Sequence, residues 1–188
     1  MSEALDELFL FGEEKMEKCI SQLQKEFATI RSGRANPAIL DKVIVEYYGA
    51  PTPLRQMSQV SVQDGTTLVI TPYDKSIMKE IEKAIIKAEI GITPNSDGVC
   101  IRLPFPPLTE DRRREIAKDV KRIGEDSKVA IRNVRRDMVD KLKKIEKDEN
   151  LPEDVTKDNQ DKIQKLTDKY IANIDKAIET KEKEVMTV

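Results

Sequence analysis

A row of lysines and arginines between positions 113 and 143 is the part of this sequence best suited to binding a polyanion. At about 100° per residue these side chains fall in one sector of a helix. A guanidinium group offers paired donors to phosphate oxygens and stacks on bases, so the sector is a candidate for contact with nucleic acid. It contains Arg114, Lys118, Lys121, Lys128, Arg132, Arg135, Arg136 and Lys143, with Arg113 at its apolar edge.

Residues 111–146 as one helix would place these basic side chains between two other faces. A solvated helix usually mixes its signs so that opposite charges meet four residues apart, whereas here most acids fall in a separate sector. Basic residues outnumber acidic ones in this stretch, although the whole chain has a net charge of −2. A merely solvated face is the alternative. The sector expected to be buried contains Ile116, Val120, Ile123, Ile131, Val134, Met138, Leu142 and Ile145.

The composition favours a binding protein over a catalyst. The chain has 188 residues, 36% of them charged and 4% aromatic, and no histidine. Histidine is the commonest general base and a common metal ligand, and no nucleotide-binding or hydrolase motif occurs. Cys19 and Cys100 lack the spacing of a metal site, so we expect two buried structural thiols. The sequence therefore predicts no catalytic residue, no metal site and no cofactor.

The sequence also gives expectations about compartment. Its longest apolar run is too short to span a bilayer, and acidic residues stand near the N-terminus where a signal or transit peptide would be basic. We expect a soluble, non-secreted monomer that does not bind membranes. A cytoplasmic protein and the mature form of a plastid stroma protein both remain open.

Apolar residues at spacings of three and four predict a first long helix over residues 2–30. Gly12 is a weak point in this helix. The run of residues 8–11 is more apolar than one face requires, so the start of the helix is expected to fray or to pack elsewhere. Gly33 is suited to a left-handed cap, and Pro37 prevents early resumption.

Between residues 36 and 103 the period changes to that of strands. Strands are predicted at residues 43–48, 60–62, 67–71 and 99–103, with Asp64 and Gly65 as a hairpin turn. Asp74 is expected to cap a helix over residues 75–90 that Gly91 ends. These elements make a small sheet covered by one helix.

The chain then returns to long helices. Thr109 is a natural N-cap for the second helix, and Pro152 suits the first turn of a third, whose apolar side chains again recur at helical spacing. The predicted fold class is α+β, a long three-helix bundle with an inserted small β/α/β domain. The bundle is expected to contain residues 1–30 and 106–188, and the insert residues 31–105.

Two segments connect the predicted domains, and either a hinge or a rigid elbow fits them. Pro104, Pro106 and Pro107 should hold their segment extended and outside the hydrogen bonding of either domain. Relative motion is the default for such a junction. The candidate hinge residues are Arg31, Ser32, Gly33, Pro104, Phe105, Pro106 and Pro107.

Seven sequence blocks are spread over almost the whole chain. They are residues 30–37 (IRSGRANP), 45–49 (VEYYG), 52–56 (TPLRQ), 106–110 (PPLTE), 129–137 (VAIRNVRRD), 164–168 (QKLTD) and 181–186 (KEKEVM). These blocks resemble the ribosome recycling factor family, and their order and number make the resemblance specific.

The resemblance implies an L-shaped, hinged molecule and a role in translation. Such factors bind the post-termination ribosome and, with elongation factor G and the GTP that this partner hydrolyses, separate the subunits and release mRNA and tRNA. The factor itself is not an enzyme. Arginines on the bundle contact large-subunit rRNA, and by motif these are Arg113, Arg132 and Arg135. Together with the basic sector, the candidate rRNA-binding residues are Arg113, Lys121, Lys128, Arg132, Arg135 and Arg136.

Two other classes of protein compete with this interpretation. A helical adaptor would grip protein partners and would need exposed apolar grooves, which the sequence does not predict. A small enzyme that uses aspartate and glutamate side chains would need a desolvated cluster of carboxylates, and no such constellation is evident.

Overall fold

The computed structural model describes residues 2–187, so positions 1 and 188 of the expected bundle lie outside the described part. The chain forms two compact units. One, called the bundle below, contains the chain up to Phe27 together with Ala117–Glu184, and the other, the small unit, contains Ala28–Ile116 and the residues from Val185 on. The division lies slightly earlier than the predicted one at the first crossing and later at the second.

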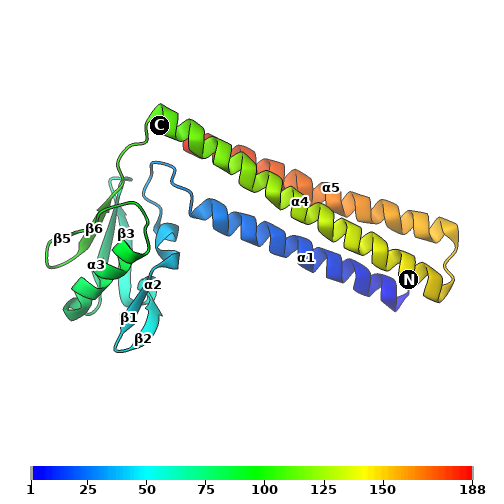
Figure 1. Cartoon of the computed structure of the whole chain (residues 1–188), viewed down its shortest axis with the longest axis horizontal. Helices are drawn as coiled ribbons and strands as arrows, with labels where there is room; N and C mark the ends of the chain where they lie inside the picture. Colours follow the sequence, from blue (N-terminus) through cyan, green and yellow to red (C-terminus); the bar gives the residue numbers. More distant parts are fainter. Residues whose placement is uncertain (1, 188) are drawn as a thin grey trace. The chain divides into compact units, whose positions relative to one another are not determined.

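Three long helices make the bundle, as predicted: α1 (Glu3–Ala28), α4 (Glu110–Glu149) and α5 (Glu153–Met186). Figure 1 shows them side by side along their length. The hydroxyl of Thr109 accepts a 3.1 Å hydrogen bond from the Arg112 amide and so caps α4, as predicted. At the other end Asn150 has φ 48, a left-handed conformation that ends α4 just before Pro152.

The apolar stripes of the three helices meet in the bundle core. Five of the eight α4 residues predicted to be buried are buried, namely Ile116, Val120, Ile131, Met138 and Leu142. The prediction was wrong for Ile123, Val134 and Ile145, which are half-exposed. For Ile123 and Val134 the reason is that both line a groove between α1 and α4.

Two glycines let the helices approach closely. A Cβ on Gly12 of α1 would overlap Met138 of α4, and a Cβ on Gly124 of α4 would overlap Ile178 of α5. The sequence indicated Gly12 as a weak point, but α1 continues through it without a break. The start of α1 is also helical from Glu3 on, so the expected fraying is not present. Gly12 therefore serves packing, because its missing side chain makes room for Met138.

The small unit contains two sheets where the sequence predicted one. β1 and β2 form an antiparallel hairpin, and the other sheet has the strand order β3-β4-β6-β5, with all neighbours antiparallel. Short helices connect the strands. The elements are η1 (Pro37–Lys42), β1 (Ile44–Tyr47), β2 (Ala50–Pro53), α2 (Leu54–Met57), β3 (Ser58–Gln63), β4 (Thr67–Pro72), η2 (Lys75–Ile77), α3 (Met78–Lys87), β5 (Asn95–Ser96) and β6 (Ile101–Pro104).

Local predictions for this unit were partly right. Asp64 and Gly65 both have positive φ and form the predicted turn between β3 and β4. Asp74 does act as an N-cap, but it caps the 3-10 turn before α3. α3 ends earlier than predicted, because Glu89, with φ 52, turns the chain before Gly91. The last strand begins at Ile101, since the Asp97 carboxylate holds the Val99 and Cys100 amides in a turn.

Candidate nucleic-acid interface

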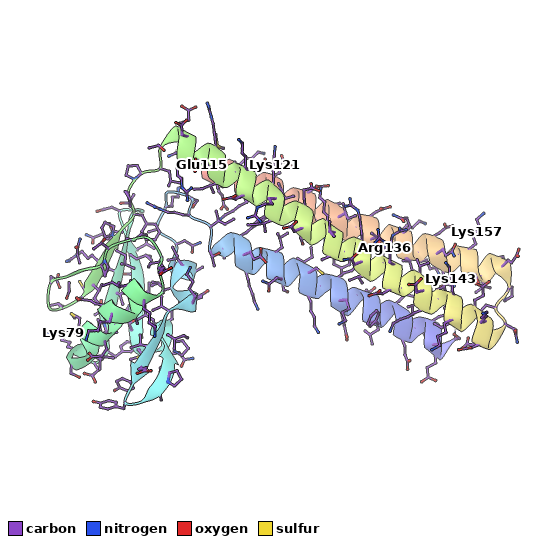
Figure 2. All side chains as sticks on the ribbon, in the orientation of Figure 1. Lys79, Glu115, Lys121, Arg136, Lys143 and Lys157 are labelled. Carbon is purple, nitrogen blue, oxygen red and sulfur yellow. The ribbon has the colours of Figure 1, made fainter. Side chains whose placement is uncertain are left out.

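The outward face of α4 carries the exposed part of the predicted basic sector. Arg132 and Arg136 lie one helical turn apart, and both are exposed. Among residues 2–187, neither guanidinium group has a hydrogen-bond or ion-pair partner. Figure 2 labels Lys121, Arg136 and Lys143 along the same helix. Arginine side chains in this state can bind phosphate oxygens without first breaking an internal ion pair.

Three other residues that were predicted to bind rRNA lie on the side of α4 that contacts α5. Lys121, Lys128 and Arg135 are spaced by seven residues, which repeats one side of a helix after two turns. The Lys121 ammonium lies 3.9 Å from Glu182, and Arg135 donates to Gln164 over 2.9 Å. The Lys128 ammonium contacts the Asp175 carboxylate. These pairs form a ladder of polar contacts between α4 and α5.

Lys128 is the most enclosed member of this ladder. Its side chain is 12% exposed, and its ammonium group also contacts Glu125 over 3.2 Å. The hydrogen bond that the Lys128 ammonium donates to Asp175 raises the pKa of Lys128, and the bond that it donates to Glu125 acts in the same direction. The sequence placed Lys128 among the residues that bind RNA, but its charge is already neutralised by two carboxylates. Its position indicates a structural contact between helices.

Arg113 lies apart from these residues. It stands in the first turns of α4, in the stretch that belongs to the small unit, and it is half-buried. Its Nε atom is buried without a hydrogen-bond partner among the described residues. Arg113 therefore belongs to the small unit, whereas Arg132 and Arg136 belong to the bundle.

The candidate hinge residues differ in how tightly they are held. Pro104 is the last residue of β6 and lies opposite Thr67, and the Phe105 amide donates to the Thr66 carbonyl over 2.7 Å. The Phe105 ring is 4% exposed and belongs to the core of the small unit. The sequence predicted that this segment joins no hydrogen bonding, which is wrong for Pro104 and Phe105. A strand-ending proline can still accept a ladder bond through its carbonyl.

The remaining crossing residues are less constrained. Arg31 donates from Nη2 to the Pro106 carbonyl over 3.2 Å, and both groups are at the surface. Gly33 has φ 84, a left-handed conformation in which an L side chain is strained. Ser32 and Pro107 lie beside them in the same two segments.

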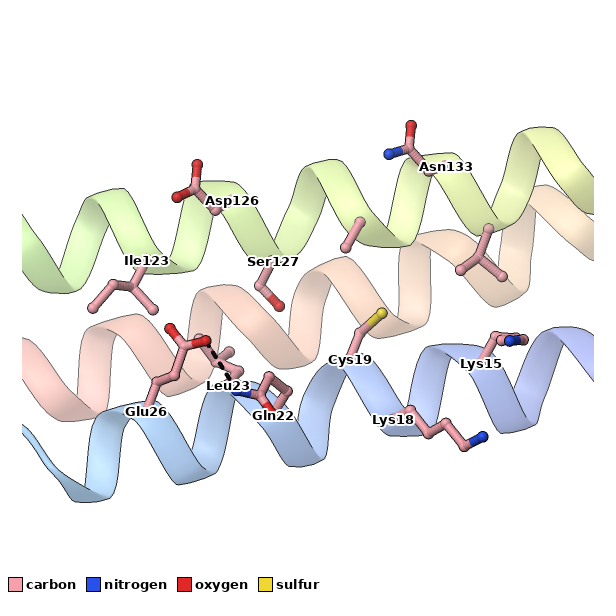
Figure 3. Close-up of a pocket in the computed structure, with 12 residues that line it drawn as sticks. Lys15, Lys18, Cys19, Gln22, Leu23, Glu26, Ile123, Asp126, Ser127 and Asn133 are labelled. Carbon is pink, nitrogen blue, oxygen red and sulfur yellow. Dashed lines mark hydrogen bonds between the residues drawn. The ribbon is translucent and has the colours of Figure 1, made fainter. Parts of the chain in front are cut away.

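The bundle has grooves that the sequence did not predict. One, of about 630 Å³, lies between α1 and α4, and Figure 3 shows Cys19 and Ser127 pointing into it from opposite helices. The Ser127 hydroxyl is buried without a partner among the described residues. Cys19 is half-buried and so less enclosed than expected. Its partial burial raises the pKa of its thiol. The sequence did not predict exposed apolar grooves, and the residues that line this groove are mostly polar or charged.

No group of three or more histidine, cysteine, aspartate or glutamate side chains in residues 2–187 could hold a metal ion. In the same part of the chain, no helix is long and apolar enough to cross a membrane.

Comparisons with known proteins point to one family. A family model described as ribosome recycling factor matches residues 23–186. The ribosome-recycling factors of Bacillus licheniformis and Bacillus subtilis are each 55% identical over 175 residues, which is 93% of this chain and 95% of theirs. That of Caldicellulosiruptor saccharolyticus is 53% identical over 177 residues, covering 94% of this chain and 96% of its own.

Two solved structures are similar over nearly the whole chain. A solution structure of ribosome recycling factor has a TM-score of 0.82 at 39% identity and covers 100% of both chains. The second has a TM-score of 0.68 at 43% identity and covers 97% of this chain and 98% of its own. It is a model of the T. thermophilus ribosome recycling factor and the E. coli elongation factor G bound to the E. coli post-termination complex.

Proposed function

The chain belongs to the ribosome recycling factor family, and we propose that it recycles ribosomes by laying the exposed face of α4 against large-subunit rRNA. Arg132 and Arg136 are the central contacts in this proposal. Their guanidinium groups are exposed one turn apart on a straight helix, so they can meet neighbouring phosphate groups of a folded RNA. The rRNA part of the proposal rests on this pair of unpartnered arginines.

The other predicted basic residues have different parts in the proposal. Arg135 uses one N–H group for Gln164 of α5, and the Lys121 ammonium lies near Glu182 of α5. Both side chains can offer their remaining donors to RNA. Lys128 holds the two helices together and does not contact RNA. Arg113 would be a separate contact, because it lies outside the bundle.

Elongation factor G is the partner that we propose for the separation of the ribosomal subunits. A similar structure carries this factor together with a ribosome recycling factor on the post-termination complex. In our proposal elongation factor G hydrolyses GTP, and the chain transmits the resulting movement to the ribosome without catalysis or a cofactor. We place the hinge at Arg31 to Gly33 and at Pro106 and Pro107, within the stretch that groups with the small unit. Pro104 and Phe105 move with the sheet and the core of that unit.

The place of action that we propose is the bacterial cytoplasm. The relatives described above come from bacteria, which favours this compartment over the plastid stroma. We propose that the chain works as a monomer, since one bundle presents the complete pair of Arg132 and Arg136.

A subunit-splitting assay tests the proposed function. Purified chain is added to post-termination ribosomes with cognate elongation factor G and GTP, and splitting is followed by light scattering. We expect splitting only when all three are present, and we expect the double variant Arg132→Ala, Arg136→Ala to lose it while keeping its helical content. Normal splitting by the double variant would overturn the proposed rRNA contact, and no splitting by the unchanged chain would overturn the function.

A further inference from the structure

A second groove of the bundle, between α1 and α5, has no part in the function proposed above. It has a volume of about 590 Å³ and is lined by residues of these two helices alone. The arginines proposed to contact rRNA lie on α4. The groove and the rRNA face therefore use different surfaces, and both can be occupied at once.

The floor of this groove is apolar. The sequence run from Leu8 to Phe11 is more apolar than one face of a helix needs, and the structure buries only Leu8 of these four residues. Leu10 is 58% exposed and lines the groove beside Phe9 and Leu166. These three side chains form a small apolar patch that would not mark a binding site by itself, so the charges of the rims must carry the recognition of an occupant.

The two rims of the groove have opposite charges. Lys162, Lys165 and Lys169 line the α5 side at spacings of three and four residues, and Asp6 and Glu13 line the α1 side seven residues apart. Within residues 2–187, no ion pair joins one rim to the other. Lys162 contacts Asp158 of its own helix over 3.3 Å. Lys162 is thus already paired, and the Lys169 ammonium lies 5.8 Å from the centre of the Tyr170 ring. The charges of Asp6, Glu13 and Lys165 remain available to a molecule between the rims.

We propose that this groove binds an amphipathic helix of a protein partner on the ribosome, with an acidic flank against the lysine rim and an apolar edge over Leu10. Seven residues of α1 or α5 span about 10 Å, which is two turns of a helix. A helix in this position would complete a local four-helix arrangement, a common way for proteins to recognise helical segments.

The charges distinguish this occupant from RNA. A phosphate backbone would be attracted to Lys165 and Lys169 but repelled by Asp6 and Glu13 on the opposite rim. A helix can satisfy both rims, because acidic and basic side chains can stand on its two flanks. The search for the partner among ribosomal proteins rests on the proposed function. The groove itself does not.

Photo-crosslinking from Leu10 tests the proposal. The full chain with p-benzoylphenylalanine at position 10 is irradiated on purified ribosomes with elongation factor G, and the product is mapped by mass spectrometry. We expect a cross-link to an amphipathic helix of a protein. The double variant Lys165→Glu, Lys169→Glu should lower the yield about tenfold, because it reverses the rim charge. Lys157→Glu, an exposed change on α5 outside the groove, should leave the yield unchanged.

Three outcomes would overturn the groove proposal: a cross-link to rRNA, a yield no higher than from the same photoreactive group at position 157, or a yield that charge reversal does not change. Pelleting with ribosomes is measured alongside. If the chain pellets but gives no protein cross-link, the groove proposal fails and the proposed function stands. If the chain does not pellet, the function fails, and the ribosomal partner fails with it.

Discussion

Arg135 donates from Nη1 to Oε1 of Gln164 over 2.9 Å, and Gln164 in turn donates from Nε2 to Asp168 over 2.8 Å. Arg135 belongs to α4 and the other two residues to α5. The amide of Gln164 therefore fixes one edge of the guanidinium group and leaves its other donors directed elsewhere. An arginine held in this way loses less side-chain freedom when it binds a phosphate.

The first prediction follows from this contact. Gln164→Leu should weaken ribosome binding about three- to tenfold, since the orientation of Arg135 rests on one hydrogen bond of ordinary strength. In the background of Arg135→Ala the same change should have no effect, because the two residues act as a unit. Binding is measured by pelleting, and Gln160→Leu on the same helix is the control. Additive effects in the double variant would show that Gln164 does not position Arg135.

Arg132 and Lys128 should separate RNA binding from stability. Arg132→Ala should weaken ribosome binding and reduce the log-log salt slope by about one, with no change in urea unfolding. Lys128→Ala should leave the salt slope unchanged and lower the free energy of unfolding by about 1 kcal/mol, since it removes a contact between helices. If Lys128→Ala reduces the salt slope as Arg132→Ala does, our assignment of Lys128 to a contact between α4 and α5 is wrong.

The two helix-contact glycines should respond differently to alanine. Gly124→Ala should destabilise the bundle by about 1–3 kcal/mol, because the new methyl group overlaps the branched and stiff Ile178. Gly12→Ala should cost less, since the flexible Met138 can move and alanine favours the helix by up to about 1 kcal/mol. Urea unfolding of both variants gives the comparison. Equal losses would contradict the role of side-chain stiffness.

Tyr170 should make the bundle sensitive to alkali. Its hydroxyl donates to Glu17 over 2.7 Å, and burial, with Glu17, raises the pKa of Tyr170 to about 12 from 10.0. Between pH 10.0 and about pH 12 the Tyr170 hydroxyl loses its proton in the unfolded chain but keeps it in the folded chain. The free energy of unfolding should therefore fall as the pH rises through this range. Tyr170→Phe should show a shallower fall over the same pH range. An identical pH profile for the two proteins would contradict the assigned titration.

Gly33 provides the test of the proposed hinge. Gly33→Ala should slow subunit splitting without weakening ribosome pelleting, because a left-handed conformation costs an L residue about 1–2 kcal/mol and narrows the range of backbone geometries. Gly65→Ala is a matched control, since Gly65 also has positive φ but lies in the turn between β3 and β4. Splitting at the normal rate by Gly33→Ala would indicate a rigid connection.

The long helices could be predicted because their apolar residues repeat over seven turns or more, and the caps at Thr109 and Asn150 act locally. β2 could not. Pro51 and Pro53 are usual strand breakers, yet they are tolerated here because β2 is an edge strand paired only with β1. The segment around Phe105 was predicted to be extended, but the hydrogen bond and the core packing of Phe105 were missed, because the prolines on both sides of it indicated a segment outside either domain.

The basic sector was predicted as one surface, but the structure divides it. A helical wheel gives the angle of each side chain and does not say which angle a neighbouring helix covers. The seven-residue spacing of Lys121, Lys128 and Arg135 was a usable signal, because Asp175 and Glu182 on the third helix repeat it. Gln164 carries no charge, so its contact with Arg135 could not be read from a charge pattern.

The two free cysteines stand in different units, Cys19 in the bundle and Cys100 in the small unit. Burial raises the pKa of both thiols, so little of the reactive thiolate is present while the chain is folded. The rate at which the buried Cys100 reacts with a labelling reagent then measures how often its surroundings open, whereas Cys19 faces an open groove and its rate measures access to that groove. The unsubstituted chain thus contains one probe of local unfolding in the small unit and one probe of the groove between α1 and α4, and the effect of ribosome binding on each labelling rate can be measured.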